Sequence, residues 1–231
     1  RANVVFTGGQ SLYEAKKDRH ANIHPFPSSI DTAHFKQARA AGEEPADQKN
    51  IPHPRMGFCG VIDERMDIEL LGQMAGLRPD WNFVMIGPVV KISDEDLPRR
   101  ANIHYLGGKD YKQLPAYIAG WDVATMPFAI NESTRFISPT KTPEYLAAGK
   151  PVVSTAIRDV VRPYGELGLV HIASTAEEFV AACEKALAED ASERLQKADE
   201  FLSHNSWDKT FVKMQDMINE AVEKNLKSQT A

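Results

Sequence analysis

Residues 138–153 of this chain read Ser138-Pro139-Thr140-Lys141-Thr142-Pro143-Glu144-Tyr145-Leu146-Ala147-Ala148-Gly149-Lys150-Pro151-Val152-Val153. Pro139 suits a loop and Pro143 suits a first helical turn, where a missing backbone N–H group costs little. Gly149 is typical of the residue that ends a helix, and the β-branched pair after Pro151 is typical of a strand. The stretch therefore predicts a loop, a short helix and a buried strand in direct succession.

The start of this predicted helix has features of a phosphate site. A helix start leaves backbone N–H groups unpaired and carries a partial positive charge, to which Lys141 adds a full charge. Glu144 lies one turn further on, where its carboxylate can accept hydrogen bonds from sugar hydroxyls. A solvated lysine and a glutamate that stabilises the helix dipole are the ordinary alternatives. Together the two residues indicate a site for a nucleotide-sugar.

Size and composition limit the class of protein. The chain has 231 residues, enough for one large domain or one domain with appendages, and a net charge of −5. That charge argues against a general nucleic-acid binder, which has a basic surface. Cys59 and Cys183 are expected to be reduced thiols in the core. The chain begins at Arg1 without a methionine or a signal-peptide pattern, so we expect a fragment or a processed piece.

From Arg55 onward, apolar strands alternate with helices. Strands are predicted at 56–62, 82–87, 103–106, 122–127, 151–155 and 168–172, and helices at 67–75, 111–120 and 175–189. Ahead of them, residues 3–7 predict a buried strand and residues 11–17 a short helix. This alternation predicts an α/β fold with a doubly wound, Rossmann-like parallel sheet. Ligands of such sheets bind at the carboxyl ends of strands, here the loops after Ile62, Ile86, Leu106, Met126 and Thr155.

Two further segments flank this pattern. Residues 36–54 are rich in Ala, Gly, Glu and Pro, which predicts a linker or a long excursion outside the core. Residues 191–231 predict two helices broken near 204–206, with Ser206 able to cap the second. That second helix has an apolar stripe that needs a surface to cover, formed by Phe211, Met214, Met217, Ile218 and Val222. No internal repeat and no metal-ligand cluster is evident.

Residues 138–153 resemble the donor-binding signature of GT-B glycosyltransferases, close to family four. Three further blocks agree with that family in order along the chain, at Gly57–Ile62 with Asp67, at Pro79–Pro88, and at Asn102–Gly108 with Leu114–Ile118. The resemblance runs from about Asn3 to Trp207, and the nearest subgroup is the teichuronic-acid and exopolysaccharide type of transferase.

The resemblance implies a division of the chain. Residues 1–35 would be the remnant of an N-terminal acceptor-binding domain with the interdomain segment, and 36–54 a linker or loop. Residues 55–205 would form the donor-binding domain of Rossmann-like type, and 206–231 a helix that crosses toward the missing N-terminal domain. A fragment of this kind is expected to be inactive alone.

The resemblance also implies roles for individual residues. Lys141, with the loop residues Ser138, Pro139, Thr140 and Thr142, would stabilise the leaving diphosphate without a metal. Glu144 would bind the ribose hydroxyls.

Three positions depart from the family pattern. Val61 and Met66 stand where the family often has Arg and Lys, so Arg65 and Arg135 are candidate replacements for the missing cations. Phe136 stands where the family has the first of its paired glutamates, which helps to hold the donor sugar. The base would be bordered, mainly through backbone, by Tyr105, Gly107, Gly108 and Lys109.

The implied reaction is transfer of a sugar from a UDP- or GDP-sugar to a glycan or lipid-linked acceptor in polysaccharide biosynthesis. No cofactor, metal or nucleic acid is expected. The implied location is cytoplasmic, with peripheral contact at the inner face of the membrane through the missing domain as an option. A sugar epimerase of the same two-domain fold, or a nucleotide-binding module that has lost catalysis, are the alternatives that the residues leave open.

Overall fold

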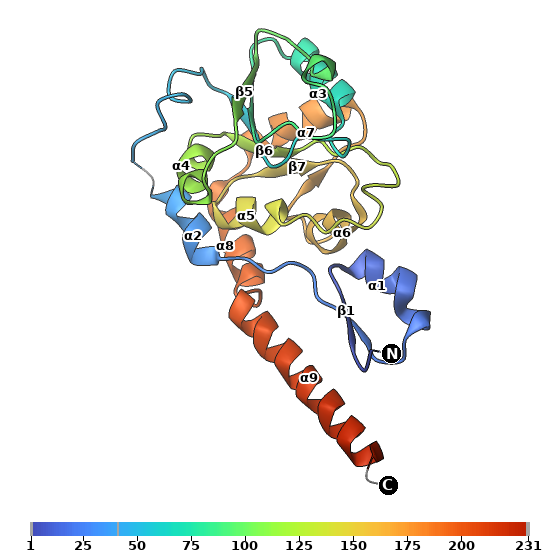
Figure 1. Ribbon diagram of the computed structural model, residues 1–231. Coiled ribbons are helices and arrows are strands. Elements are labelled where there is room, and N and C mark those ends of the chain that lie inside the picture. Colours follow the sequence, from blue (N-terminus) through green and yellow to red (C-terminus); the bar gives the residue numbers. More distant parts are fainter. Residues whose placement is uncertain (1, 41, 230–231) are drawn as a thin grey trace.

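A parallel β-sheet lies at the centre of the structure, a computed structural model that describes residues 2–40 and 42–229. Within these residues the sheet has six strands in the order β5-β4-β3-β6-β7-β8, and each neighbouring pair is parallel (Figure 1). This order reverses direction between β3 and β6, as in doubly wound sheets. The predicted α/β, Rossmann-like fold is therefore confirmed.

The strands and helices have the following bounds. The strands are β1 (Val5–Thr7), β2 (Ile23–Pro25), β3 (Arg55–Cys59), β4 (Asn82–Ile86), β5 (Ile103–Gly107), β6 (Val123–Met126), β7 (Val152–Ser154) and β8 (His171–Ile172). The α-helices are α1 (Gln10–Lys16), α2 (Thr32–Lys36), α3 (Ile68–Leu77), α4 (Leu114–Ala119), α5 (Lys141–Ala147), α6 (Arg158–Val160), α7 (Ala176–Ala188), α8 (Ala191–Leu202) and α9 (Trp207–Gln229). Short helical turns are η1 (Lys17–Arg19), η2 (Gln37–Arg39), η3 (Asp94–Asp96), η4 (Tyr111–Gln113) and η5 (Val161–Gly165).

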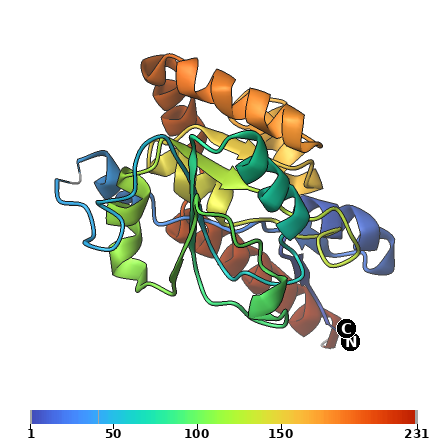
Figure 2. The ribbon, with the colours of Figure 1, turned by 90° about the horizontal axis from the view of Figure 1, so that it is seen from above.

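Helices cover both faces of the sheet. One face shares a hydrophobic cluster with side chains of α2, α4, α5 and α8, and the other shares a cluster with α3 and α7. Figure 2 views the molecule from the side of α3 and α7. Because both faces are covered, β6 and β7 consist of buried residues throughout, which explains their continuous apolar sequence.

Local sequence sets the helix ends. Asp67 caps α3 by accepting from the backbone N–H of Leu70, and Thr175 caps α7 in the same way for Glu178. Gly149 follows α5 with a φ of +81°, a conformation that glycine adopts without strain, so α5 stops before β7.

The first predicted strand differs from expectation. β1 is paired only with β2, in a two-stranded parallel sheet, and of its residues only Thr7 is buried. This small unit, blue in Figures 1 and 2, lies to one side of the main sheet, so its apolar residues lack a second covering layer. The strand predicted at 3–7 is therefore present as β1, but the expectation that it is buried is wrong except at Thr7.

Residues 36–54 also differ from expectation, because part of this segment belongs to the core. Gln48 is fully buried, donates its amide to the Tyr117 carbonyl at 2.9 Å, and accepts from the Trp121 indole at 3.0 Å. Ala38 and Ile51 join the hydrophobic cluster beside α4 and α5. A polar segment can be buried once its polar groups find partners, which composition does not reveal.

The C-terminal residues form the two predicted helices. α8 ends at Leu202 and α9 begins at Trp207, with the Ser206 hydroxyl accepting from the backbone N–H of Lys209. In Figure 1, α9 (red) extends away from the sheet. Phe211 and Val222 of the predicted apolar stripe are exposed there.

Both cysteines are free and buried, as expected. Burial raises the pKa of Cys59 to about 11, and it raises the pKa of Cys183 as well. Neither thiol is therefore ionised at neutral pH.

Candidate functional site

A cavity of about 340 Å³ opens at the point where the sheet reverses its order. Its walls come from the ends of β3 and β6 and from the segment that leads into α5. The lining residues are Phe58, Gly60, Val61, Arg65, Phe128, Ile137, Ser138, Pro139, Thr140 and Lys141. We call this the Lys141 cavity. It lies where doubly wound sheets bind their ligands. The loops after β3 and β6 and the segment 138–141 therefore line one cavity at the carboxyl ends of the strands.

Lys141 and Glu144 form the charged part of this region. The Lys141 ammonium lies 2.8 Å from a carboxylate oxygen of Glu144, and both side chains are largely buried. Burial opposes the charge of Lys141, but the pKa of Lys141 is nevertheless raised, and at neutral pH the Glu144 carboxylate supports its charge through an ion pair and a hydrogen bond. The lysine therefore remains a cation at neutral pH and can attract an anion into the cavity.

Arg65 supplies a second cation to the same cavity. Its guanidinium makes a two-pronged contact with buried Asp63, with Nε to Oδ1 at 2.9 Å and Nη2 to Oδ2 at 2.6 Å. The hydrogen bond to Asp63 raises the pKa of Arg65 and fixes the direction of the guanidinium. Sequence reasoning missed Asp63, although an aspartate two residues before an arginine in a loop is a usable signal.

The loops that carry these cations are joined by backbone contacts. Ala129 donates its N–H to the carbonyl of Arg65 at 2.8 Å, and Met66 forms a bridge with Phe128. Gly87, directly after β4, packs closely against the turn at Gly60. A Cβ atom at Gly87 would lie 1.7 Å from the carbonyl oxygen of Gly60, so only a glycine allows this approach. The cavity wall is therefore held in place from β4 as well as from β3 and β6.

Thr142 is not on this wall. Its side chain is fully buried and its hydroxyl contacts the Met126 sulfur at 3.6 Å. Its backbone N–H points back to the carbonyl of Pro139 at 3.4 Å. The expected substrate contact by Thr142 therefore has no support in this geometry, because the residue lies on the core side of α5.

Arg135 lies at a second, larger cavity of about 650 Å³ between the loops after β6 and β7. Its lining residues are Ile130, Asn131, Glu132, Thr134, Arg135, Ala156, Ile157 and Arg158. The Arg135 guanidinium is paired with Glu132 at 3.3 Å and stacks over Phe136. The structure thus separates Arg135 from Lys141 and Arg65, although the segment 130–141 borders both cavities.

The residues expected around the base are placed in different directions. Tyr105 packs with the cluster beside α3 and α7, and its hydroxyl donates to the Pro98 carbonyl at 3.2 Å. Its ring therefore lies on the opposite face of the sheet from α5. Lys109 is paired with Asp47 at 2.6 Å. The side chains of Tyr105 and Lys109 are thus engaged outside the Lys141 cavity.

Gly107, the last residue of β5, and Gly108 leave open space beside the backbone. Gly107 has a φ of +69°, and its carbonyl accepts from the N–H of Gly87 at 2.9 Å. A Cβ at Gly107 would meet no heavy atom within 4 Å, and one at Gly108 would meet only Pro88 at 3.9 Å. There is therefore open space beside this backbone, and contact of Gly107 and Gly108 with a base stays a prediction.

Residues 2–40 and 42–229 contain no group of three or more His, Cys, Asp or Glu side chains that could hold a metal ion. None of the helices in this part of the chain is both long enough and apolar enough to cross a bilayer.

Sequence comparison relates the chain to known transferases. The family described as "Glycosyl transferases group 1" matches residues 53–189. TuaH of Bacillus subtilis, a candidate teichuronic acid biosynthesis glycosyltransferase, is 31% identical over 142 residues, which cover 60% of this chain and 36% of TuaH. The chain thus spans little more than a third of that relative.

Solved structures share the fold. Sucrose-phosphate synthase from Thermosynechococcus elongatus has a TM-score of 0.73 at 16% identity, covering 97% of this chain and 59% of the synthase. A glycosyltransferase from Rickettsia africae has a TM-score of 0.74 at 14% identity, and the match covers 95% of this chain and 63% of the Rickettsia chain. HepE from Anabaena, solved with UDP and glucose, has a TM-score of 0.67 at 13% identity, covering 98% of this chain and 63% of HepE.

These structures share the GT-B arrangement implied by the sequence motifs. The family match covers more than half of the chain and includes the loops, strands and helix that build the Lys141 cavity. The protein therefore belongs to the group 1 glycosyl transferases, with a GT-B, family-four-like fold.

Proposed function

We propose that this chain binds a UDP- or GDP-sugar as the donor half of a glycosyltransferase. The observation that carries the proposal is the meeting of Lys141 and Arg65, from segments far apart in the sequence, on the wall of one cavity. Glu144 lies beside Lys141. Two fixed cations suit a diphosphate, and the carboxylate suits the hydroxyls of the adjoining ribose.

In the proposed reaction, the bond between the sugar and the diphosphate breaks and negative charge grows on the leaving diphosphate. Lys141 and Arg65 would stabilise that charge, which lowers the barrier because both groups are already oriented before reaction. Lys141 would exchange part of its contact with Glu144 for the phosphate, which frees the carboxylate for the ribose. Ser138, Pro139 and Thr140 would shape the wall around the phosphates.

The acceptor side belongs to the proposal for the whole protein. We propose a glycan or lipid-linked acceptor in polysaccharide biosynthesis, supported by the likeness to TuaH. In the proposed division, residues 1–35 include the remnant of an N-terminal domain, and residues 36–54 pack with the donor domain of 55–205, since Ala38 and Ile51 lie in its core. The helix that follows residue 205 would contact the N-terminal domain through its exposed apolar side chains. On the basis of the family resemblance, we also propose a cytoplasmic location at the inner face of the membrane.

Calorimetric titration with UDP, GDP and ADP tests the donor site. We expect UDP or GDP to bind with a dissociation constant well below about 1 mM, since two charge-assisted contacts and a ribose contact are available. Lys141→Ala and Glu144→Ala should each weaken binding by about tenfold. Lys197→Ala is the matched control, because Lys197 also pairs with a glutamate on a helix, Glu193, at 2.7 Å on the surface.

Failure of all three nucleotides to bind would overturn the proposed donor site. Binding that survives both Lys141→Ala and Glu144→Ala would overturn the residue assignment. The chain alone is expected to bind donor without transferring sugar, and efficient transfer would contradict the need for a further domain. Interconversion of free nucleotide-sugars would favour an epimerase, and binding without any transfer by the whole protein would favour a non-catalytic module.

A further inference from the structure

The cavity of about 650 Å³ between the loops after β6 and β7 has two arginines on its wall, and we call it the Arg135 cavity. Arg135 comes from the loop before α5, and Arg158 is the first residue of α6. Exposed Ile130 and buried Ile157 add apolar surface to the same wall. A cavity of this size with apolar surface and a few charged groups suits an organic ligand that carries charge at one point.

The loop that carries Arg135 is held in place by its own hydrogen bonds. Thr134 is buried, and its hydroxyl donates to the Ala129 carbonyl at 2.5 Å and accepts from the Asn131 N–H at 3.0 Å. The Arg135 guanidinium lies over the ring of Phe136, 5.2 Å from its centroid. Arg135 is therefore presented to the cavity by an ordered loop.

The acidic partners of the two arginines can be exchanged for another anion. Arg135 contacts Glu132 through Nη1 alone, at 3.3 Å, and the Glu132 side chain is 86% exposed. Arg158 contacts Glu14 of α1 through Nη2 alone. The other nitrogens of both guanidinium groups have no hydrogen-bond partner within residues 2–40 and 42–229. Because exposed ion pairs of this kind contribute about 1 kcal/mol or less, a ligand anion can replace either glutamate.

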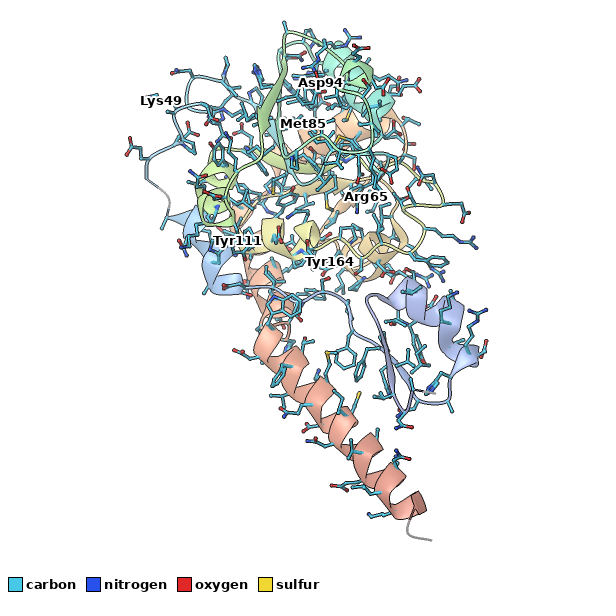
Figure 3. All side chains as sticks on the ribbon, in the orientation of Figure 1. Lys49, Arg65, Met85, Asp94, Tyr111 and Tyr164 are labelled. Atoms are coloured by element: carbon cyan, nitrogen blue, oxygen red, sulfur yellow. The ribbon has the colours of Figure 1, made fainter. Side chains whose placement is uncertain are left out.

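The Arg135 cavity lies between the Lys141 cavity and α1. The segment 130–141 borders both cavities. Figure 3 shows Arg65 of the Lys141 cavity close to the loop after β6, whose backbone donates to the Arg65 carbonyl at 2.8 Å. On the other side, α6 adjoins α1 (Figure 1), and Asp159 accepts from the Ser11 N–H at 2.9 Å. A molecule that approaches the Lys141 cavity from the side of residues 1–35 therefore meets the Arg135 cavity.

We propose that the Arg135 cavity binds an anionic group of the acceptor saccharide, a uronate carboxylate or a phosphate, between Arg135 and Arg158. This inference rests on the proposed function, because it takes the Lys141 cavity as the donor site and residues 1–35 as part of the acceptor side. A guanidinium matches both anions, since two parallel N–H groups meet two oxygens. Ile130 would contact the apolar face of the sugar ring. The two arginines thereby select acidic saccharides over neutral ones and do not hold the diphosphate.

Titration calorimetry of the 231-residue chain with acidic and neutral saccharides tests this proposal. The probes are tetragalacturonate, its neutral methyl ester, and tetra(glycerol phosphate), which carries phosphate in place of carboxylate. At least one acidic probe should bind about tenfold more tightly than the methyl ester. Binding of tetragalacturonate alone identifies a carboxylate site, and binding of tetra(glycerol phosphate) alone identifies a phosphate site.

Variants of the cavity wall assign the binding to residues. Arg135→Ala and Arg158→Ala should each weaken binding of the acidic probe by about tenfold, while the affinity for UDP or GDP stays within about twofold. Arg135→Lys should restore only part of the loss, because an ammonium lacks the two-pronged geometry. Glu132→Gln should strengthen binding by about twofold, since it removes a competing carboxylate. Arg99→Ala is the matched control, because Arg99 pairs with Asp94 outside both cavities and its side chain is 54% exposed, close to the 53% of Arg158.

The possible failures are separate. The acceptor proposal is overturned, while the donor site stands, if neither acidic probe binds or if the methyl ester binds equally well. Losses in Arg99→Ala equal to those in Arg135→Ala and Arg158→Ala would overturn it as well, since binding would then follow net charge alone. If the unaltered chain binds neither UDP nor GDP, the proposed function itself fails, and the assignment of the anion to an acceptor fails with it.

Discussion

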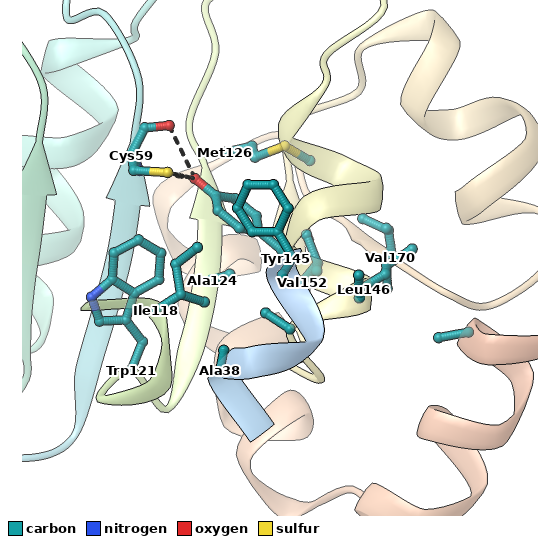
Figure 4. Packing of buried hydrophobic residues seen from close by; sticks show 14 of the residues in the cluster. Ala38, Cys59, Ile118, Trp121, Ala124, Met126, Tyr145, Leu146, Val152 and Val170 are labelled. Atoms are coloured by element: carbon teal, nitrogen blue, oxygen red, sulfur yellow. Dashed lines mark hydrogen bonds between the residues drawn. The ribbon is translucent and has the colours of Figure 1, made fainter. Parts of the chain in front are cut away.

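The phenolic oxygen of Tyr145, on α5, accepts a hydrogen bond from the backbone N–H of Cys59 at 2.8 Å. The same hydroxyl lies 3.3 Å from the Cys59 carbonyl, as Figure 4 shows. Both residues are almost completely buried. The contact joins the helix that carries Lys141 and Glu144 to the end of β3, where the Gly60 turn begins. It therefore fixes Lys141 of α5 relative to the opposite wall of the Lys141 cavity.

Tyr145→Phe should lower the free energy of unfolding by about 1–3 kcal/mol, because it leaves the buried N–H of Cys59 without its partner. Urea denaturation of the variant and the unaltered chain measures this difference. Tyr111→Phe is the control, since its hydroxyl is at the surface and its removal should change stability by less than about 0.5 kcal/mol. Equal stabilities for the two variants would refute the role assigned to the Tyr145 hydroxyl.

Gly87→Ala should be strongly destabilising, by about 3 kcal/mol or more. Gly87 has a φ of +147°, and the added Cβ would lie 1.7 Å from the Gly60 carbonyl oxygen. Either the turn at Gly60 moves or the fold is lost, so nucleotide binding should fall as well. Gly108→Ala, whose Cβ would meet only Pro88 at 3.9 Å, is the control. Thermal unfolding and calorimetry give the two readouts, and a Gly87 variant as stable as the Gly108 variant would contradict the close approach.

Arg65→Ala should weaken binding of a nucleoside diphosphate by about tenfold, whereas Arg135→Ala should leave it within about twofold. The reason is placement, because Arg65 lines the Lys141 cavity and Arg135 lines the neighbouring one. Titration with the nucleotide that binds the unaltered chain measures both. A larger loss from Arg135→Ala would show that the diphosphate occupies the second cavity.

Asp47→Asn should lower the free energy of unfolding by about 1 kcal/mol at neutral pH. Asp47 accepts from the Lys109 ammonium at 2.6 Å and from the Tyr117 hydroxyl at 2.7 Å. Burial works to raise the pKa of Asp47, but these two hydrogen bonds outweigh it and hold the pKa below its usual value.

The pH dependence follows from the direction of that shift. Because the folded pKa of Asp47 is lower than the unfolded one, its contribution is present above about pH 4 and is lost as the pH falls through the folded pKa. The pKa of Lys109 is raised, first by its bond to Asp47, so its contribution is lost only as the pH rises through that value. The gap between Asp47→Asn and the unaltered chain should close in acid, as measured by urea denaturation from about pH 7 to 3. Asp94→Asn, in an exposed pair with Arg99, should show a smaller gap.

Local sequence was sufficient for the main sheet and for the helix that starts at Lys141. The apolar runs of β4 and β6 and the caps Asp67 and Thr175 act over a few residues, and such patterns can be read without knowing the neighbours. The same holds for Gly149, whose positive φ ends α5. The family motif could therefore be placed on a loop and a helix start from the sequence.

Tertiary structure decided which side chains share a space. His34 and Tyr111 stack across 77 residues of sequence, and Gln48 is buried only because Tyr117 and Trp121 supply partners for its amide. The face of the sheet that holds Tyr105 and the cavity that holds Arg135 depend in the same way on pairing and packing between distant segments. Periodicity and capping are properties of neighbouring residues, whereas burial and stacking are properties of contacts. The sequence thus determined where the loop and helix start of the family motif lie, and the fold determined which residues border the Lys141 cavity beside them.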